Sequence, residues 1–282
     1  MGGTEQIGAA WRRASQRIDR RDARRLLEHV GACTHADLIA HPERELSTAQ
    51  AAQFADLLLR REAGEPLAYL LGSTFFKGLE FAVSPAVLIP RPDTEVLVDQ
   101  ALKQAQAFVA PRIVDLGTGS GIVAILMARL CPSATVTAVE VSAAALECAR
   151  VNARRHSVEI RFLEGDWFDP LGTERFDLMV SNPPYVADGD PHLQQNGLPF
   201  EPQVALCDGV SGGNGMACIR TLIQGAHKHL LPGGWLLIEH GYDQAVEVRD
   251  LLRAAGFAEL ASWCDDAAIE RVSGGRQPIA DQ

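Results

Sequence analysis

The chain has 282 residues, of which 47% are hydrophobic and 22% charged, an ordinary composition for a globular protein. Its formal net charge of -10 argues against a general affinity for nucleic-acid backbones, which comes from clustered Lys and Arg. The six cysteines form no C-x-x-C pair and no Cys/His spacing that suits zinc, so the sequence predicts reduced thiols and no metal site. Since no signal-peptide pattern or bilayer-length apolar run occurs, we expect a cytoplasmic protein without a membrane partner.

Residues 1–66 predict a small helical domain. Apolar residues recur there at roughly helical spacing, and Thr34 and Ser47 suit helix N-caps, while no stretch has the pattern of a strand. Seven arginines lie within residues 12–25. They indicate either a solvated helix face or, in a sharper interpretation, a binding face for an acidic partner.

Residues 67–92 change character and predict a β-hairpin that links two domains. Two β-prone runs, 74–76 and 79–83, flank a Gly-bearing turn at 77–78. Such a hairpin can act as a hinge or as one wall of a cleft.

The loop that follows is stiffened by prolines on both sides of Arg91. Asp93 or Thr94 can then cap a helix that runs to about Phe108. A charged side chain between two prolines favours a loop that also shapes a binding site.

From residue 112 onward, short apolar runs alternate with helical patterns. The predicted strands are 113–116, 135–139, 160–163, 176–181 and 234–238, with two more near Leu260 and Val272. The predicted helices are 122–130, with Ile122, Ile125, Leu126 and Leu130 facing inward, 142–155, 216–231 and 246–255. This alternation predicts an α/β domain over residues 93–282 with a mostly parallel, doubly wound sheet.

A glycine-rich turn follows the first of these strands. Its spacing is G-x-G-x-G over residues 117–121, not the G-x-G-x-x-G of dinucleotide-binding folds. Asp115 puts a carboxylate beside the turn, where it would repel a diphosphate but not an ammonium or sulfonium group. The pattern therefore disfavours a Rossmann dehydrogenase.

Acidic and aromatic residues end the next two strands. Glu140 can accept hydrogen bonds from both hydroxyls of a ribose, and Asp166 and Trp167 can contact the edge and face of an adenine. A ligand with a ribose, a base and a positive charge favours S-adenosylmethionine over NAD. The predicted cofactor-binding residues are Asp115, Gly117, Thr118, Gly119, Gly121, Glu140, Val141, Asp166, Trp167 and Asn182.

The fourth strand ends in Asn182, Pro183, Pro184 and Tyr185. The two prolines stop the strand and fix Asn182 at its carboxyl end, where open α/β sheets bind ligands. The Asn side-chain oxygen and proline carbonyls can accept hydrogen bonds from an NH₂ group. The motif predicts a site that grips an amide or amine nitrogen, although a Pro-rich turn alone would account for it.

These four strand ends together resemble the class I methyltransferases that act on amide or amine nitrogen. More narrowly, Gly-Glu-Pro-Leu-Ala-Tyr at 64–69 and Leu-Ile-Pro-Arg-Pro-Asp-Thr-Glu at 88–95 are similar to the peptide chain release factor glutamine methyltransferases, the PrmC/HemK family. Glu201-Pro202 with Ala205-Leu206, and Ile-Glu-His-Gly at 238–241, fit as well. The sequence departs from the family at Glu140, where Asp is usual, and the longer acid should still reach a ribose.

The resemblance implies a Rossmann-like class I methyltransferase sheet with a small N-terminal helical domain and a linking β-hairpin. It implies methyl transfer from S-adenosyl-L-methionine, with S-adenosyl-L-homocysteine as product, to the glutamine amide nitrogen (N5) in the Gly-Gly-Gln motif of class 1 release factors. Residues 1–66 would recognise the factor, and the enzyme would be a monomer without nucleic-acid contacts. The implied catalytic residues are Asn182, Pro183 and Tyr185, and the implied substrate-binding residues are Asn182, Pro183, Pro184, Tyr185 and Arg91.

Three alternatives stay open beside the dehydrogenase. A ribosomal-protein glutamine methyltransferase could use the same Asn-Pro-Pro-Tyr site. So could a nucleic-acid amino-methyltransferase, but the insertion between Asp188 and Cys207 is short and lacks the basic character that target recognition needs. A non-catalytic adaptor with this fold is disfavoured because every expected site residue is present.

Overall fold

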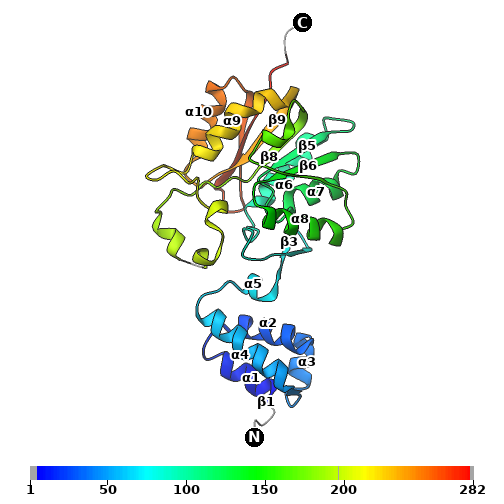
Figure 1. Cartoon of the computed structure of the whole chain (residues 1–282), viewed down its shortest axis with the longest axis vertical. Coiled ribbons are helices and arrows are strands. Elements are labelled where there is room, and N and C mark those ends of the chain that lie inside the picture. Colours follow the sequence, from blue (N-terminus) through cyan, green and yellow to red (C-terminus); the bar gives the residue numbers. More distant parts are fainter. Residues whose placement is uncertain (1–4, 196, 280–282) are drawn as a thin grey trace. The chain divides into compact units, whose positions relative to one another are not determined.

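The computed structural model describes residues 5–195 and 197–279. The chain divides into two compact units, Met1–Ser73 with Gln194–Phe200, and Thr74–Leu193 with Glu201–Gln282 (Figure 1). Each unit has its own buried apolar clusters. Among the described residues, no helix combines the length and the apolar character that crossing a bilayer requires.

The first unit is built mainly of helices packed around one apolar cluster. Its helices are α1 (Ile7–Ala14), α2 (Arg20–Gly31), α3 (His35–Ala40), α4 (Thr48–Glu62) and α5 (Leu67–Leu71). The predicted caps are confirmed, because Thr34 and Ser47 each accept a backbone N–H in a capping box. The prediction that no strand occurs is wrong, since β1 (Glu5–Gln6) pairs antiparallel with β2 (Glu45–Leu46). Strands of two residues carry no readable periodicity.

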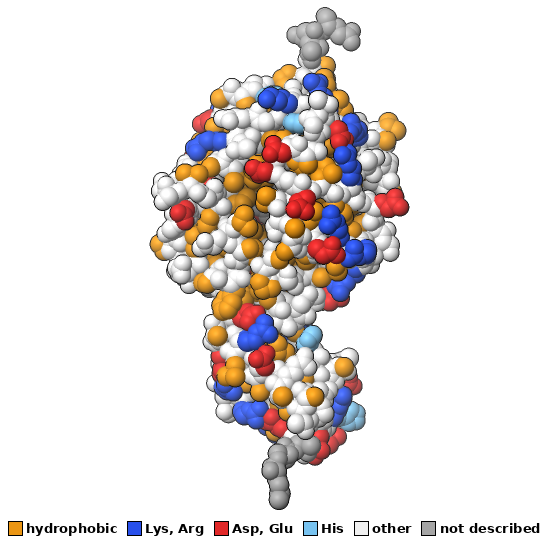
Figure 2. Space-filling view, viewed as in Figure 1, with side chains coloured by type: hydrophobic (Ala, Val, Ile, Leu, Met, Phe, Trp, Pro, Cys, Tyr) orange, Lys and Arg blue, Asp and Glu red, His pale blue; other side chains and the backbone are white. Residues whose placement is uncertain are grey.

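Four of the seven arginines of residues 12–25 form ion pairs within the first unit. The pairs are Arg13 with Glu5, Arg17 with Glu62, and Arg24 and Arg25 with Glu28. Figure 2 shows basic and acidic side chains intermingled on the displayed face of this unit. The pairing favours the solvated-face interpretation over a surface for an acidic partner.

The predicted hairpin is present as β3 (Ser73–Phe76) and β4 (Leu79–Ala82). Its turn has positive φ at Lys77 and Gly78, as the twist of a two-residue hairpin turn requires. The buried Asn152 ties the hairpin to the glycine-rich turn: it accepts from the Ala82 N–H at 2.7 Å and donates to the Ala82 and Ser120 carbonyls at 3.0 and 2.9 Å.

The second unit is organised around a seven-stranded sheet with the order β10-β11-β9-β8-β5-β6-β7. The strands are β5 (Arg112–Leu116), β6 (Thr135–Glu140), β7 (Arg161–Glu164), β8 (Phe176–Ser181), β9 (Leu230–Glu239), β10 (Ala258–Cys264) and β11 (Glu270–Arg276). β5 to β9 pair in parallel, whereas β11 pairs antiparallel with β9 and β10. The predicted doubly wound, mostly parallel sheet is confirmed.

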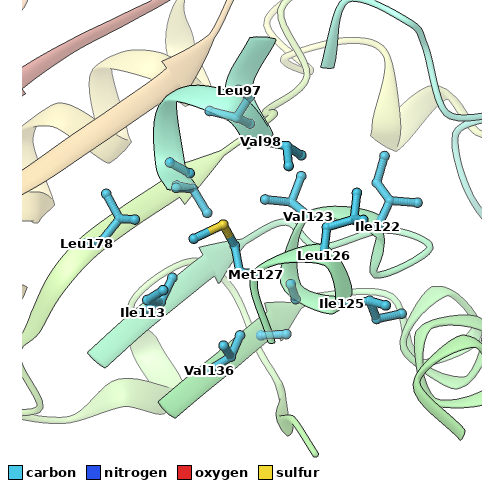
Figure 3. Packing of buried hydrophobic residues seen from close by; sticks show 14 of the residues in the cluster. Leu97, Val98, Ile113, Ile122, Val123, Ile125, Leu126, Met127, Val136 and Leu178 are labelled. Atoms are coloured by element: carbon cyan, nitrogen blue, oxygen red, sulfur yellow. The ribbon is translucent and has the colours of Figure 1, made fainter. Parts of the chain in front are cut away.

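Helices cover both faces of this sheet (Figure 1). One layer consists of α6 (Thr94–Ala105), α7 (Ile122–Leu130) and α8 (Ala143–Arg155), and the other of α9 (Ala217–His229) and α10 (Ala245–Ala254). Figure 3 shows apolar side chains of α6 and α7 packed on those of β5, β6 and β8. The prediction that Leu130 faces inward is wrong: it is 51% exposed at the last residue of α7, and Val123 and Met127 are buried instead.

The strand order changes direction at β5, which lies between β6 and β8. The chain runs from β5 outward through β6 and β7, then returns to the other side of β5 with β8 and β9. In open parallel sheets, such a switch point opens a crevice at the carboxyl ends of the strands. Leu116 and Ser181 are paired there, so Asp115, Glu140 and Asn182 share one edge of the sheet.

Candidate active site

A cavity of about 640 Å³ lies at this edge, within the second unit. Its size falls in the range of roughly 300–1,000 Å³ that is typical of small-molecule sites. The residues predicted from sequence that line it are Arg91, Asp115, Gly117, Thr118, Gly119, Glu140, Val141, Asp166, Trp167, Asn182 and Pro184. The structure therefore brings strand ends that are far apart in the chain together around one space.

Three residues predicted for the site, Gly121, Pro183 and Tyr185, are not among those lining the cavity. Gly121 is the N-cap position of α7, where an added Cβ would lie 3.0 Å from the Cβ of Ala149, so the residue allows close packing of helices. Pro183, the residue after Asn182, is buried. Tyr185 points back toward β9, where its hydroxyl lies 3.5 Å from Glu239 Oε1.

The glycine-rich turn brings backbone to the cavity. Gly117 and Gly119 have φ of 74° and 57°, a left-handed conformation that residues with a Cβ rarely adopt. Nothing lies within 4 Å of where a Cβ on Gly119 would stand, whereas one on Gly117 would lie 3.4 Å from the Trp167 ring. The turn leaves room for a ligand against its backbone.

Asp115 is held rigidly beneath the turn and is only 2% exposed. Its Oδ2 accepts from the Thr118 hydroxyl at 2.6 Å and from the Ala124 N–H at 3.2 Å. Burial raises the pKa of Asp115 to about 6, while these two hydrogen bonds lower the pKa and the charge of Glu140 raises it. At neutral pH the group is mostly ionised, so the cavity favours a cationic group beside it.

Glu140 is fixed by one backbone N–H on each oxygen. Gly119 N donates to Oε2 at 2.9 Å and Ser142 N donates to Oε1 at 3.0 Å. Each carboxylate oxygen keeps a second lone pair. Glu140, where the family usually has Asp, therefore still presents two oriented acceptors, which suit a pair of vicinal hydroxyls.

Trp167 forms an apolar wall after the end of β7. Its φ of 39° is unusual for a bulky residue, and its ring lies against Gly117. Asp166 beside it also lines the cavity. The pairing of a flat ring with an acceptor suits a heteroaromatic base.

Asn182 is oriented from behind by the start of α6. Its Nδ2 donates to the Thr94 hydroxyl oxygen at 3.2 Å, and Thr94 is 1% exposed. The predicted cap position is confirmed, since Asp93 is the N-cap residue of α6, but its side chain makes no cap bond and pairs with Arg271 at 3.2 Å. Both side chains are drawn away from the helix by partners far along the chain.

Arg91 lines the cavity, but its guanidinium is already paired with the buried carboxylate of Glu201. Glu201 also accepts from the Ile89 N–H at 2.9 Å. This carboxylate therefore fastens the loop around residue 201 to the loop before α6. Sequence reasoning noted Glu201 only as part of a family pattern and assigned it no contact.

Thr94, which lines the cavity, and Glu239, which lies beside the Tyr185 hydroxyl, were quoted from the sequence only within family patterns and were given no role in the site. Glu239 ends the apolar strand β9 and is 1% exposed, so a lone acid after a run of buried residues was the available signal. For Thr94, a role as helix cap explained its place in the sequence, whereas in the structure its hydroxyl accepts from Asn182.

Burial raises the pKa of the Tyr185 hydroxyl, and the carboxylate of Glu239 adds to that rise.

Comparison with known proteins agrees with this geometry. Residues 7–72 match the family described as PrmC N-terminal domain, and residues 92–196 match the Methyltransferase small domain. A release factor glutamine methyltransferase of Burkholderia pseudomallei is 49% identical over 268 residues, covering 93% of this chain and 93% of that protein. One of Bordetella pertussis is 49% identical, covering 92% and 95%.

Among solved structures, a methyltransferase from Pyrococcus furiosus superposes with a TM-score of 0.53 at 17% identity, covering 83% of this chain and all of that one. This likeness shows that the chain shares the fold of that methyltransferase. The extent and identity of the sequence matches go further. The chain belongs to the release factor glutamine methyltransferase family.

Proposed function

We propose that this protein transfers a methyl group from S-adenosylmethionine to the side-chain amide nitrogen (N5) of the glutamine in the Gly-Gly-Gln motif of class 1 release factors. The observation that carries the proposal is the placement of Asn182 on the same cavity as Asp115 and Glu140. An acceptor suited to an amide NH₂ thus shares a space with two carboxylates suited to the cofactor. The names of the relatives supply the substrate.

The residues of the cavity fit S-adenosylmethionine. The buried carboxylate of Asp115 suits the positive charge of the cofactor, and the two oriented acceptors of Glu140 suit its ribose hydroxyls. The ring of Trp167 forms an apolar wall that suits its base. When bound, the cofactor supplies a methyl group that its sulfonium makes electrophilic.

Asn182 and Pro183 act on the substrate nitrogen. An amide nitrogen is a poor nucleophile because its lone pair is delocalised into the carbonyl. The Asn182 side-chain oxygen and the Pro183 carbonyl would accept its two N–H bonds, which orients the nitrogen and favours the positive charge that develops on it. Pro184, which lines the cavity, would pack beside the substrate amide, whereas Tyr185 would support the loop from the side of β9. The product would lose its extra proton to water or a carbonyl afterwards.

The two units divide the work in this proposal. We assign residues 1–66 to recognition of the release factor, 67–92 to a link and 93–282 to methyl transfer. The separate family matches at 7–72 and 92–196 support a division of this kind. A net charge of -10 supports a protein substrate over a nucleic acid. The proposed enzyme is a cytoplasmic monomer.

The test is methyl transfer from radiolabelled S-adenosylmethionine to a purified release factor with an intact Gly-Gly-Gln loop, beside the same factor with that Gln changed to Ala. We expect label on the first factor only. Label on neither, with cofactor binding retained, would redirect the assignment to a ribosomal protein or a nucleic acid.

The Asn182→Ala variant tests the role of the amide in the same assay. Removing one oriented acceptor should lower kcat by about 10²- to 10³-fold. Cofactor affinity measured by calorimetry should change little. Equal loss of turnover and affinity would mean that Asn182 supports the fold of the loop and does not touch the substrate.

A further inference from the structure

The loop that carries Asn182 is held at its far end by the side chain of Gln244, the N-cap residue of α10. Gln244 Nε2 donates to the Tyr185 carbonyl at 3.0 Å and to the Asn214 carbonyl at 3.2 Å, and its Oε1 accepts from the Gly241 N–H at 2.8 Å. One amide thus joins the end of this loop to the loop before α9 and to the turn after β9. The proposed mechanism gives this residue no part.

The Gly241 N–H fixes which end of the Gln244 amide faces Tyr185. A backbone N–H can only donate, so the amide oxygen must lie toward Gly241 and the NH₂ toward the other two contacts. Both of these are carbonyl oxygens, which only accept. If the amide were turned round, its NH₂ would face the Gly241 N–H and its oxygen would face the Tyr185 carbonyl, so all three contacts would be lost.

The Tyr185 carbonyl is also enclosed closely by backbone. A Cβ added at Gly215 would overlap this carbonyl and would lie 3.0 Å from Gln244 Nε2, and Gly215 has a φ of 76°. Only a residue without a side chain lets the loop before α9 approach so closely. The Val186 N–H, the other half of the same peptide group, donates to the Leu206 carbonyl at 2.9 Å. Both polar groups of this peptide are therefore held from outside the Asn182 loop.

Two prolines carry this restraint back toward the substrate. Pro183 and Pro184 have a fixed φ and no N–H, so the chain between Asn182 and Tyr185 has few free torsions and cannot be tied through the prolines' own nitrogens. Fixing the Tyr185 carbonyl therefore limits where the Asn182 side chain and the Pro183 carbonyl can stand.

We propose that Gln244 is a positioning residue for methyl transfer, which acts through the Tyr185 carbonyl to hold the Asn182 loop where its acceptors meet the substrate nitrogen. The inference rests on the proposed function, since these acceptors matter only for a substrate with an NH₂ group. The carboxylates proposed to bind the cofactor, Asp115 and Glu140, stand on other strands. The role of Gln244 should therefore appear in turnover and not in cofactor affinity.

Steady-state kinetics on three variants test this role. Gln244→Glu keeps the acceptor for the Gly241 N–H but turns an oxygen toward the carbonyls of Tyr185 and Asn214, whereas Gln244→Met keeps the length without either kind of bond. Each should lower kcat by about 10- to 100-fold, with calorimetric affinity for S-adenosylmethionine within about twofold of the parent. Gln106→Glu, the same change at an exposed position after α6, is the matched control and should leave kcat unchanged.

The two Gln244 variants separate positioning of the loop from support of the turn after β9. If Gln244 served only to brace Gly241, Gln244→Glu would keep that bond and most of kcat, and only Gln244→Met would be slow. We expect Gln244→Glu to be at least as slow as Gln244→Met, because its carboxylate faces two carbonyl oxygens. Parental kcat in Gln244→Glu, or equal losses of kcat and cofactor affinity in both variants, would overturn the proposal.

The restraint on Tyr185 also has a readout that needs no substrate. The chain has three tyrosines, and only Tyr185 precedes a valine. Protein labelled with ¹³C at tyrosine carbonyls and with ¹⁵N at valine therefore gives one ¹³C–¹⁵N correlation, from the peptide between Tyr185 and Val186. In Gln244→Met its carbonyl signal should move upfield, because the carbonyl loses a hydrogen bond, and in Gln106→Glu it should stay in place.

An unmoved carbonyl signal in Gln244→Met would overturn the proposal. If the parent enzyme labels no release factor, the proposed function fails, and this signal still decides whether Gln244 holds the Tyr185 carbonyl.

Discussion

Asp115 shows how one buried residue can make cofactor binding depend on pH. Its carboxylate is taken out of water, and this raises its pKa to about 6 despite the hydrogen bonds from Thr118 and Ala124. A cation bound beside it favours the ionised form, so binding and deprotonation are linked. Above pH 6 the charge is in place, and below pH 6 it is progressively lost.

We therefore expect the affinity for S-adenosylmethionine to fall by roughly three- to fivefold between pH 7.0 and pH 5.5. Asp115→Asn should bind more weakly at both values and lose this dependence. Calorimetry at the two pH values measures both effects. A parallel pH dependence in Asp115→Asn would assign the titration to another group.

The site residues that could be predicted from the sequence are those that a local sequence pattern marks. Asp115, Glu140 and Asn182 each end an apolar run, and parallel strands gather such ends at one edge. Asp93 does occupy the N-cap of α6, but the ion pair of its side chain was not foreseen because its partner, Arg271, is distant in sequence. Glu239 was assigned no contact for the same reason, since the Tyr185 hydroxyl beside it comes from a distant part of the chain.

At the scale of elements, Asn152 joins three parts of the second unit. From α8 it bonds both backbone groups of Ala82 on β4 and the carbonyl of Ser120 in the glycine-rich turn. It is fully buried, so no water can replace these bonds. The hairpin thereby braces the turn that faces the cavity.

Asn152→Leu removes all three bonds while keeping a similar volume. It should lower the free energy of unfolding of the second unit by about 2–4 kcal/mol, because backbone groups are left buried without partners. Cofactor affinity should also fall as the turn loosens. Arg154→Ala on the exposed side of the same helix should change stability by no more than about 0.5 kcal/mol. Urea unfolding measures both, and equal stability of the two variants would contradict the bracing role.

The bounds of helices and strands were predictable where an apolar run in the sequence coincides with a buried element of the structure. The strand at 176–181 and the helix at 122–130 match β8 and α7, because a buried strand and an apolar helix leave unmistakable runs. Residues 67–71 form helix α5 and not part of the hairpin, since one turn of helix has too few residues to show a period. Leu130 was misplaced because the end of α7 extends past the apolar cluster that covers its first two turns.

At the scale of the whole molecule, the two units have separate apolar cores. Leu26 belongs to the cluster of the first unit and Leu237 to a cluster of the second, and both are fully buried. Since the clusters share no residue, a defect in one leaves the packing of the other intact.

Calorimetric unfolding should therefore show two transitions, and S-adenosylmethionine should raise only the one that belongs to the second unit. Leu26→Ala should cost about 2–5 kcal/mol in the first transition and leave cofactor affinity unchanged. Leu237→Ala should affect the other transition by a similar amount. A single transition that the cofactor shifts as a whole would show that the units unfold together.

The order of the strands also decides when each half of the cavity can form during synthesis. β5, β6 and β7 are consecutive in the chain and adjacent in the sheet, so the carboxylates on the cofactor side can assemble as soon as this stretch emerges. The strand that leads to Asn182, β8, gains its neighbour β9 only later, because β9 is made after it. A nascent chain can thus complete the cofactor side of the cavity well before the sheet beside the Asn182 loop is complete.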